Sequence, residues 1–186
     1  SYIKQLHLLR AVAVLGVVFY HYTDGYFTGG WLGVDVFFVL SGFLISNTII
    51  SSLIKKNFKF KLFYIRRIRR ILPSLLSTIL FTVPFSFQLL APKELIEYLR
   101  STASSLFFIS NFYLLDLDFY NTSSAKLMPM IHTWSLSIEE QFYIVFPVLM
   151  FLIYKNEKIN KFLIIVIFFI VSIFIAASLS RQVAFY

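Results

Sequence analysis

Long apolar runs, separated by shorter polar connectors, set the pattern along the chain. Each run comes close to the roughly 17–25 residues that a helix needs to cross a bilayer. The polar connectors between the runs are typical of loops that return the chain to water. We therefore predict an all-α fold, a polytopic bundle of transmembrane helices embedded in the lipid bilayer. The five predicted spans cover residues 6–22, 31–54, 71–90, 131–154 and 162–179.

Basic residues in the connectors predict which way the bundle faces. Eight lysines and arginines and no acidic residue lie within residues 55–70. Such an excess is typical of a cytoplasmic loop. The connector 23–30 has no basic residue and is expected outside, whereas 155–161 carries three lysines and is expected inside. A cytoplasmic N-terminus followed by five crossings satisfies all three assignments.

The outer connector, residues 91–130, contains the apolar stretch "STASSLFFISNFYLL". This stretch is too short for a sixth span, and a sixth span would also place the lysines of residues 155–161 outside. We expect a helix that lies at the membrane interface or re-enters the protein. The chain stops soon after the fifth apolar run. We therefore expect residues 1–186 to be the N-terminal part of a larger multi-pass domain of the inner (plasma) membrane.

The composition agrees with a membrane protein and excludes several kinds of chemistry. Hydrophobic residues make up 59% of the chain and charged residues 14%, against about 45–50% and about 25% in soluble domains. The net charge is +8, and the basic residues cluster between apolar runs. This placement indicates cytoplasmic loops and not a nucleic-acid partner. The absence of cysteine excludes disulfides and thiol catalysis, and three widely spaced histidines predict no metal site.

The first apolar run, "RAVAVLGVVFYH", carries an ionisable residue at each end. Arg10 and His21 are 11 positions apart, about 1100° around a helix, so their side chains share one face and lie about 16 Å apart along the axis. Ionisable groups inside a membrane are functional candidates by default. In the alternative interpretation, Arg10 reaches the inner interface and His21 sits at the outer one.

The second and fourth runs carry acidic residues near their outer ends. Asp35, in "GVDVFFVLSGFLIS", can interact with the dipole at its own helix N-terminus or orient His21 across the bundle. Glu139, in "HTWSLSIEEQFY", shares a face with His132, while Glu140 points about 100° away. Adjacent acids in a membrane need a wet cavity or a cation, and pairing with an arginine would give them a purely structural role.

Four arginines precede the third run in "FYIRRIRRILP". Helical spacing puts Arg66, Arg69 and Arg70 along one side and turns Arg67 away from them. The planar fork of arginine suits phosphate groups better than the point charge of lysine does. The cluster therefore indicates a phosphate site. The alternative is an anchor that contacts anionic lipid at the inner face.

Taken in order, these four blocks resemble the acyltransferase-3 family of membrane O-acyltransferases, and they cover most of the chain. One departure is that His7 and Leu8 stand where family members commonly have an acidic residue and a glycine. The resemblance implies transfer of an acyl group, expected to be acetyl, from cytoplasmic acyl-CoA. It implies that the acceptor is a hydroxyl of an envelope or exported glycan such as O-antigen, free or linked to lipid.

The resemblance also implies roles for the residues that the pattern singled out. Arg10 and the four arginines are expected to bind the phosphates of acetyl-CoA. His21 is expected to take a proton from the acceptor hydroxyl, or to become acylated first. Asp35 and Glu139 are candidates to orient or charge-balance His21, or to hold an arginine. The remaining alternatives are a transporter that relays protons through these groups and a non-catalytic relative.

Overall fold

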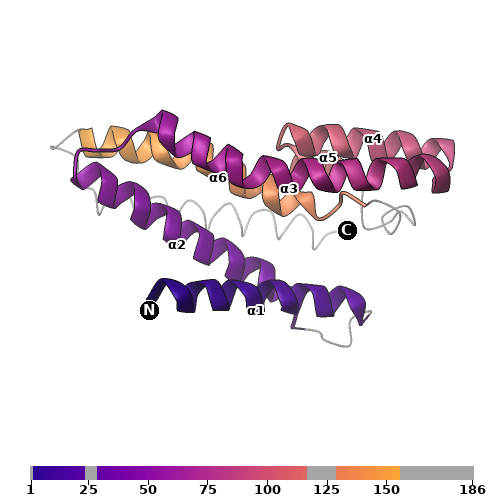
Figure 1. Cartoon of the computed structure of the whole chain (residues 1–186), viewed down its shortest axis with the longest axis horizontal. Coiled ribbons are helices and arrows are strands. Elements are labelled where there is room, and N and C mark those ends of the chain that lie inside the picture. The colour runs from indigo at the N-terminus through magenta and orange to yellow at the C-terminus, as the bar shows by residue number, and fades with distance from the viewer. Residues whose placement is uncertain (1, 24–28, 117–128, 156–186) are drawn as a thin grey trace. The chain divides into compact units, whose positions relative to one another are not determined.

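The computed structural model describes residues 2–23, 29–116 and 129–155, and these ranges contain helices and no strand. This confirms the all-α fold class. Contacts divide the chain into two compact units, Ser1–Phe146 and Pro147–Tyr186, and every contact discussed below lies within the first unit. The helices are α1 (Tyr2–Tyr22), α2 (Leu32–Ile54), α3 (Phe60–Leu89), α4 (Pro92–Leu106), α5 (Ser110–Asp116) and α6 (Thr133–Lys155) (Figure 1).

Three of the described helices are long and apolar enough to cross a membrane: α2, α3 and α6. They cover the predicted runs 31–54, 71–90 and 131–154. The run 6–22 is helical as part of α1, which is not among these three, and the run 162–179 lies outside the described residues. The number of spans and the orientation of the N-terminus therefore stay predictions.

Helix α3 begins at Phe60, well before the apolar run that starts at residue 71. Lysine and arginine are good helix formers, so the helix extends back through the basic segment without a break. Pro73 and Pro84 both lie inside it. The arginine cluster precedes both prolines and sits on the first turns of this helix. The direction of each guanidinium is therefore set by the helical period.

The described part of the long connector after α3 contains two helices, α4 and α5. Pro92 occupies the first turn of α4, where its missing N–H costs no hydrogen bond. The Glu94 carboxylate accepts a hydrogen bond of 3.0 Å from the Ala91 N–H and so caps that helix end. The Tyr98 side chain is fully buried and donates to or accepts from Thr82 on α3 at 2.7 Å. The connector thus packs on the bundle as helix, while a position at the membrane interface stays a prediction.

Helices α1 and α2 approach each other closely at Gly33. A Cβ added at Gly33 would lie 2.2 Å from the Ala13 carbonyl oxygen and 2.9 Å from the Val17 Cγ2 atom. Glycine is required because no larger side chain fits between the two backbones. Gly42, deeper in α2, has no such neighbour within 4 Å. The crossing at Gly33 holds the part of α1 between Arg10 and His21 against α2.

Hydroxyl groups join the α4–α5 segment to the start of α6. Ser105 and Thr133 lie 2.6 Å apart through their side-chain oxygens, and Ser110 and Ser137 lie 2.7 Å apart. All four residues are buried. Buried hydroxyls are favourable only when they are hydrogen-bonded, as these are. The first turns of α6 are therefore fixed by the connector that precedes them.

Candidate active site

Arg10 is buried where α1, α2 and α6 meet. Only 8% of the residue is exposed. Its Nη2 atom donates a hydrogen bond to the Ser41 hydroxyl and lies 3.8 Å from the Oε1 atom of Glu139. Its guanidinium also lies over the Phe37 ring, 4.8 Å from the centroid, in a cation–π contact. Of the two partners predicted for Glu139, His21 or an arginine, the structure has the arginine.

Tyr143 extends this cluster along α6. Its hydroxyl donates a hydrogen bond to the same Glu139 oxygen that faces Arg10. Its ring lies under the Arg67 guanidinium of α3, 4.6 Å from the centroid. Tyr143 thus contacts both the carboxylate partner of Arg10 and one member of the arginine cluster. The sequence interpretation missed Tyr143, although the four-residue spacing from Glu139 puts the two on one face of a helix.

The four arginines of α3 do not all face the same surroundings. Arg67 turns inward, toward Tyr143, and is half-buried, whereas Arg66, Arg69 and Arg70 are exposed. Arg67 therefore turns away from Arg69 and Arg70, as the helical spacing predicted, whereas Arg66 lines one cavity together with Arg67. It is this divergent arginine that reaches the polar cluster around Arg10.

A basic cavity of about 380 Å³ lies where the end of α2 meets the start of α3. Arg66 and Arg67 both line it, while Arg69 and Arg70 are not among the residues that line it. Lys59, just before the start of α3, adds a third positive charge. The other residues of the lining are Thr48, Ser52, Asn57, Phe58, Leu62 and Phe63.

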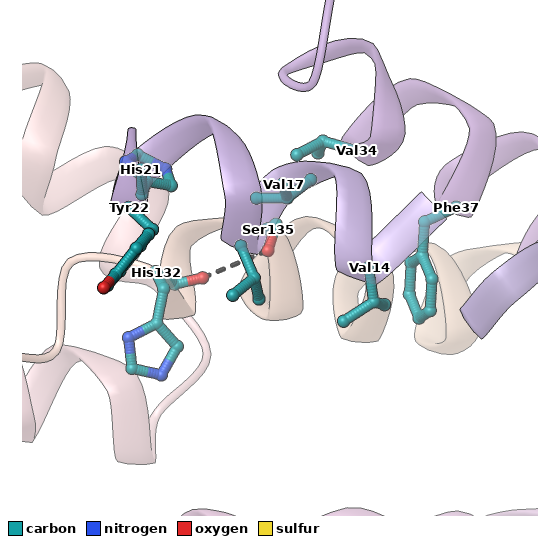
Figure 2. Close-up of a pocket in the computed structure, with 9 residues that line it drawn as sticks. Val14, Val17, His21, Tyr22, Val34, Phe37, His132 and Ser135 are labelled. Atoms are coloured by element: carbon teal, nitrogen blue, oxygen red, sulfur yellow. Dashed lines mark hydrogen bonds between the residues drawn. The ribbon is translucent and has the colours of Figure 1, made fainter. Parts of the chain in front are cut away.

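A larger cavity of about 710 Å³ lies along the C-terminal half of α1. Figure 2 shows His21, Tyr22 and His132 toward one end of this cavity, and Val14 and Phe37 toward the other. The residues that line it are Val14, Val17, Val18, His21, Tyr22, Val34, Phe37, His132 and Ser135.

His21 is exposed at the end of α1, and its ring makes an edge contact with Tyr20 at 5.2 Å between centroids. Neither Asp35 nor Glu139 lines the cavity around His21. Asp35 is exposed on α2, and Glu139 lies with Arg10. His132, in contrast, lines the same cavity as His21. From the sequence, helical spacing related His132 only to Glu139.

His132 lies just before α6 and outside the candidate span. Although part of the residue stays exposed, burial of the imidazole lowers its pKa below the ordinary value of 6.5, and a hydrogen bond with the Pro129 carbonyl partly opposes that shift. A lowered pKa keeps the ring neutral at pH 7. Within residues 2–23, 29–116 and 129–155, no group of three or more metal-ligating side chains occurs.

Comparison with known proteins gives the family. The family model described as an acyltransferase domain matches residues 3–186, and the chain belongs to this acyltransferase family. The resemblance read from the four sequence blocks is thereby confirmed. No solved structure matches the chain.

Curated relatives are named as O-acetyltransferases. The O-acetyltransferase OatA of Staphylococcus aureus (strain NCTC 8325 / PS 47) is 37% identical over 177 residues, which is 92% of this chain and 28% of the relative. The protein named "Putative O-acetyltransferase SACOL0978" of Staphylococcus aureus (strain COL) is 40% identical over 150 residues, 80% of this chain and 25% of the relative. The chain thus spans about a quarter of the length of these relatives.

Proposed function

We propose that the protein is a membrane-bound O-acyltransferase that moves an acetyl group from cytoplasmic acetyl-CoA to a hydroxyl of an envelope or exported glycan, such as O-antigen. The observation that carries this proposal is the arrangement along α1. Arg10 lies in a buried polar cluster, and His21 lies in a cavity of about 710 Å³. Membership of the acyltransferase family and the names of the relatives support the class of reaction.

The basic cavity at the start of α3 is the proposed site for the phosphates of the donor. Lys59, Arg66 and Arg67 converge on it, and acetyl-CoA carries several phosphate charges. Guanidinium groups bind phosphate through strong charge-assisted hydrogen bonds. Arg69 and Arg70 are exposed on the same helix, so we propose that they contribute long-range attraction instead of direct contacts.

Arg10 is the proposed link between the donor site and the cavity around His21. Its Nε–H is buried and has no hydrogen-bond partner within the described part of the chain. A buried donor without a partner is costly, so this group is available to a polar atom of the bound donor. The side chain also contacts Phe37, which lines the larger cavity. This contact supports a path for the thioester arm from Arg10 toward His21.

The distribution of apolar and polar residues in the larger cavity supports the same path for the thioester arm, from Arg10 toward His21. Its apolar end, with Val14 and Phe37, suits the arm and the acyl chain of the donor, and its polar end presents His21. Along α1, Arg10 and His21 are about 16 Å apart by the rise per residue of a helix. A donor held by its phosphates on the inner side therefore brings its thioester toward His21.

His21 is the proposed catalytic base. In direct transfer, the imidazole takes the proton of the acceptor hydroxyl while that oxygen attacks the thioester carbonyl carbon. The carbon–sulfur bond breaks, and the departing sulfur takes the proton as CoA thiol. In the alternative route, the imidazole nitrogen attacks first, the carbon–sulfur bond breaks, and the sulfur leaves as CoA thiol with the ring proton. The acceptor oxygen then takes the acyl group from the ring, and the hydroxyl proton passes to the imidazole. Both routes need an unprotonated nitrogen on His21.

The two acidic candidates receive different proposed roles. Glu139 balances the charge of Arg10, because its carboxylate is the neighbour of that guanidinium. Asp35 is one residue from Val34, which lines the larger cavity. We propose Asp35 as a candidate to interact with His21 or the acceptor once substrate is bound.

A radiochemical assay tests the proposed function. Membranes from cells that express the natural protein in full are supplied with acetyl-CoA labelled in the acetyl group. The expected result is label in envelope glycan that mild alkali releases as acetate, in amounts well above membranes without the protein. Retention of all label in CoA, with no binding of acetyl-CoA to the purified protein, would instead favour a transporter or a non-catalytic relative.

A further inference from the structure

The cavity around His21 holds a second histidine. His132 and Ser135, from the start of α6, line the same space as His21 and Tyr22 (Figure 2). The other residues of the lining are four valines and a phenylalanine. In a mostly apolar site, the few polar groups fix the orientation of a ligand. The polar contacts available to a substrate are therefore concentrated around these residues.

The backbone on either side of His132 is firmly held. Met130 is fully buried, and Thr133 is 2% exposed. The Thr133 backbone N–H and side-chain hydroxyl both donate to the Met130 carbonyl, at 3.1 and 2.7 Å. The Ser135 hydroxyl donates to the His132 carbonyl at 3.0 Å. Two buried anchors thus flank His132, which lines the cavity.

The connector helices support these anchors. The Thr133 hydroxyl lies 2.6 Å from the Ser105 hydroxyl of α4 and 3.2 Å from the Ser110 hydroxyl of α5. All three groups are buried. Well-packed, hydrogen-bonded support of this kind is what a functional side chain needs to hold a productive position. The α4–α5 segment therefore fixes the site from which His132 approaches His21.

We propose that His132 is an acceptor-binding residue. Its imidazole hydrogen-bonds one hydroxyl of the acceptor while His21 acts on the neighbouring hydroxyl that receives the acyl group. A neutral imidazole offers one donor and one acceptor nitrogen. Its N–H bonds the Pro129 carbonyl, so the other nitrogen is the one that accepts a hydrogen bond from a sugar hydroxyl. Ser135 adds a further hydroxyl beside it. This inference rests on the proposed function, and His132 itself forms and breaks no covalent bond.

The test separates binding of the acceptor from the chemistry of the donor. Vesicles that contain the natural protein in full receive labelled acetyl-CoA and, as acceptor probe, a tetrasaccharide of N-acetylglucosamine. Transfer to the sugar gives kcat and the acceptor KM, and hydrolysis of acetyl-CoA without sugar reports the donor side alone. The variants are His132→Phe and the polar His132→Gln. The matched control is His7→Gln, which changes an exposed histidine on the same protein.

We expect His132→Phe to raise the acceptor KM about tenfold, the value of one hydrogen bond of ordinary strength. Hydrolysis of acetyl-CoA should stay within about twofold of wild type. The acceptor KM of His132→Gln should lie between the values for wild type and His132→Phe. An unchanged acceptor KM in both variants overturns the role of His132 in acceptor binding and leaves the proposed function standing. So does a fall in kcat and hydrolysis together at constant KM. If His132→Phe does not fold, His132→Gln decides. A wild type that transfers no acetyl group to the sugar overturns the proposed function as well.

Discussion

The guanidinium of Arg10 on α1 lies 3.8 Å from the carboxylate of Glu139 on α6, and each side chain is about nine-tenths buried. These residues are far apart in the sequence, yet the contact joins the two helices that carry the candidate site. Because both charges are removed from solvent, neither is tolerated well without the other. The pair therefore fixes where α1 lies against α6, and with it the position of His21.

Removing one charge of this pair should cost more than removing both. Glu139→Leu leaves Arg10 buried without its partner and should lower stability by about 3–5 kcal/mol. The double variant Arg10→Met with Glu139→Leu should recover a large part of that loss, without recovering activity. Thermal denaturation of the detergent-purified protein measures both. A double variant that is no more stable than Glu139→Leu would contradict the pairing.

Tyr143 should contribute through its hydroxyl and its ring separately. Tyr143→Phe removes the hydrogen bond to Glu139 and keeps the ring under Arg67, so we expect a loss of about 1 kcal/mol. Tyr143→Leu removes both contacts and should cost at least about 0.5–1 kcal/mol more. Thermal denaturation of both variants under identical detergent conditions separates the contribution of the hydroxyl from that of the ring. Equal stability of the two variants would show that the ring contact contributes nothing.

The α1–α2 crossing should not tolerate a side chain at Gly33. Gly33→Ala places a methyl group 2.2 Å from the Ala13 carbonyl oxygen, so the helices must separate, at a cost of about 1–3 kcal/mol or more. The matched control is Gly42→Ala in the same helix, where nothing lies within 4 Å. Denaturation midpoints and acetyl transfer should both fall for Gly33→Ala alone. A similar loss in the two variants would argue against close packing at Gly33.

The arginines of α3 should differ in their effect on the donor. Arg66→Gln removes a charge that lines the basic cavity, and we expect acetyl-CoA to bind about tenfold more weakly, the value of one charge-assisted contact. Arg69→Gln removes an exposed charge outside the lining and should change binding less than about threefold. Titration calorimetry at two salt concentrations measures both dissociation constants. Equal effects would favour a diffuse electrostatic attraction over a defined phosphate site.

The helices could be predicted from the sequence more fully than the contacts between them. The run 31–54 and the helix Leu32–Ile54 nearly coincide because a spanning helix is defined by the apolar length that the bilayer requires. The start of α3 at Phe60 could not be read from hydropathy, because a helix continues through basic residues once it is in water. That Arg67 turns away from Arg69 and Arg70 followed from the helical period alone, whereas the cavity that Arg66 and Arg67 share did not.

The neighbours across the bundle could not be predicted, because a period gives the face of a helix and not what lies opposite. The sequence put Glu139 within reach of His21 or of an arginine, and the structure has it beside Arg10. Likewise, only the structure distinguishes Gly33, where the α1 backbone comes close, from Gly42, which has no neighbour within 4 Å. The presence of His132 in the cavity of His21 depends on the fold of the α4–α5 connector, which carries no local signal for it.

The central claim is that His21 performs the transfer to the acceptor, and one substitution tests it most directly. His21→Ala is compared with His7→Ala, a change of an exposed histidine on the same helix, in the natural protein expressed in full. Loss of a positioned general base costs about 100-fold or more in rate. The account predicts at least that fall in glycan acetylation for His21→Ala, with wild-type expression and acetyl-CoA binding, and little change for His7→Ala. Normal acetylation by the His21→Ala protein would contradict it.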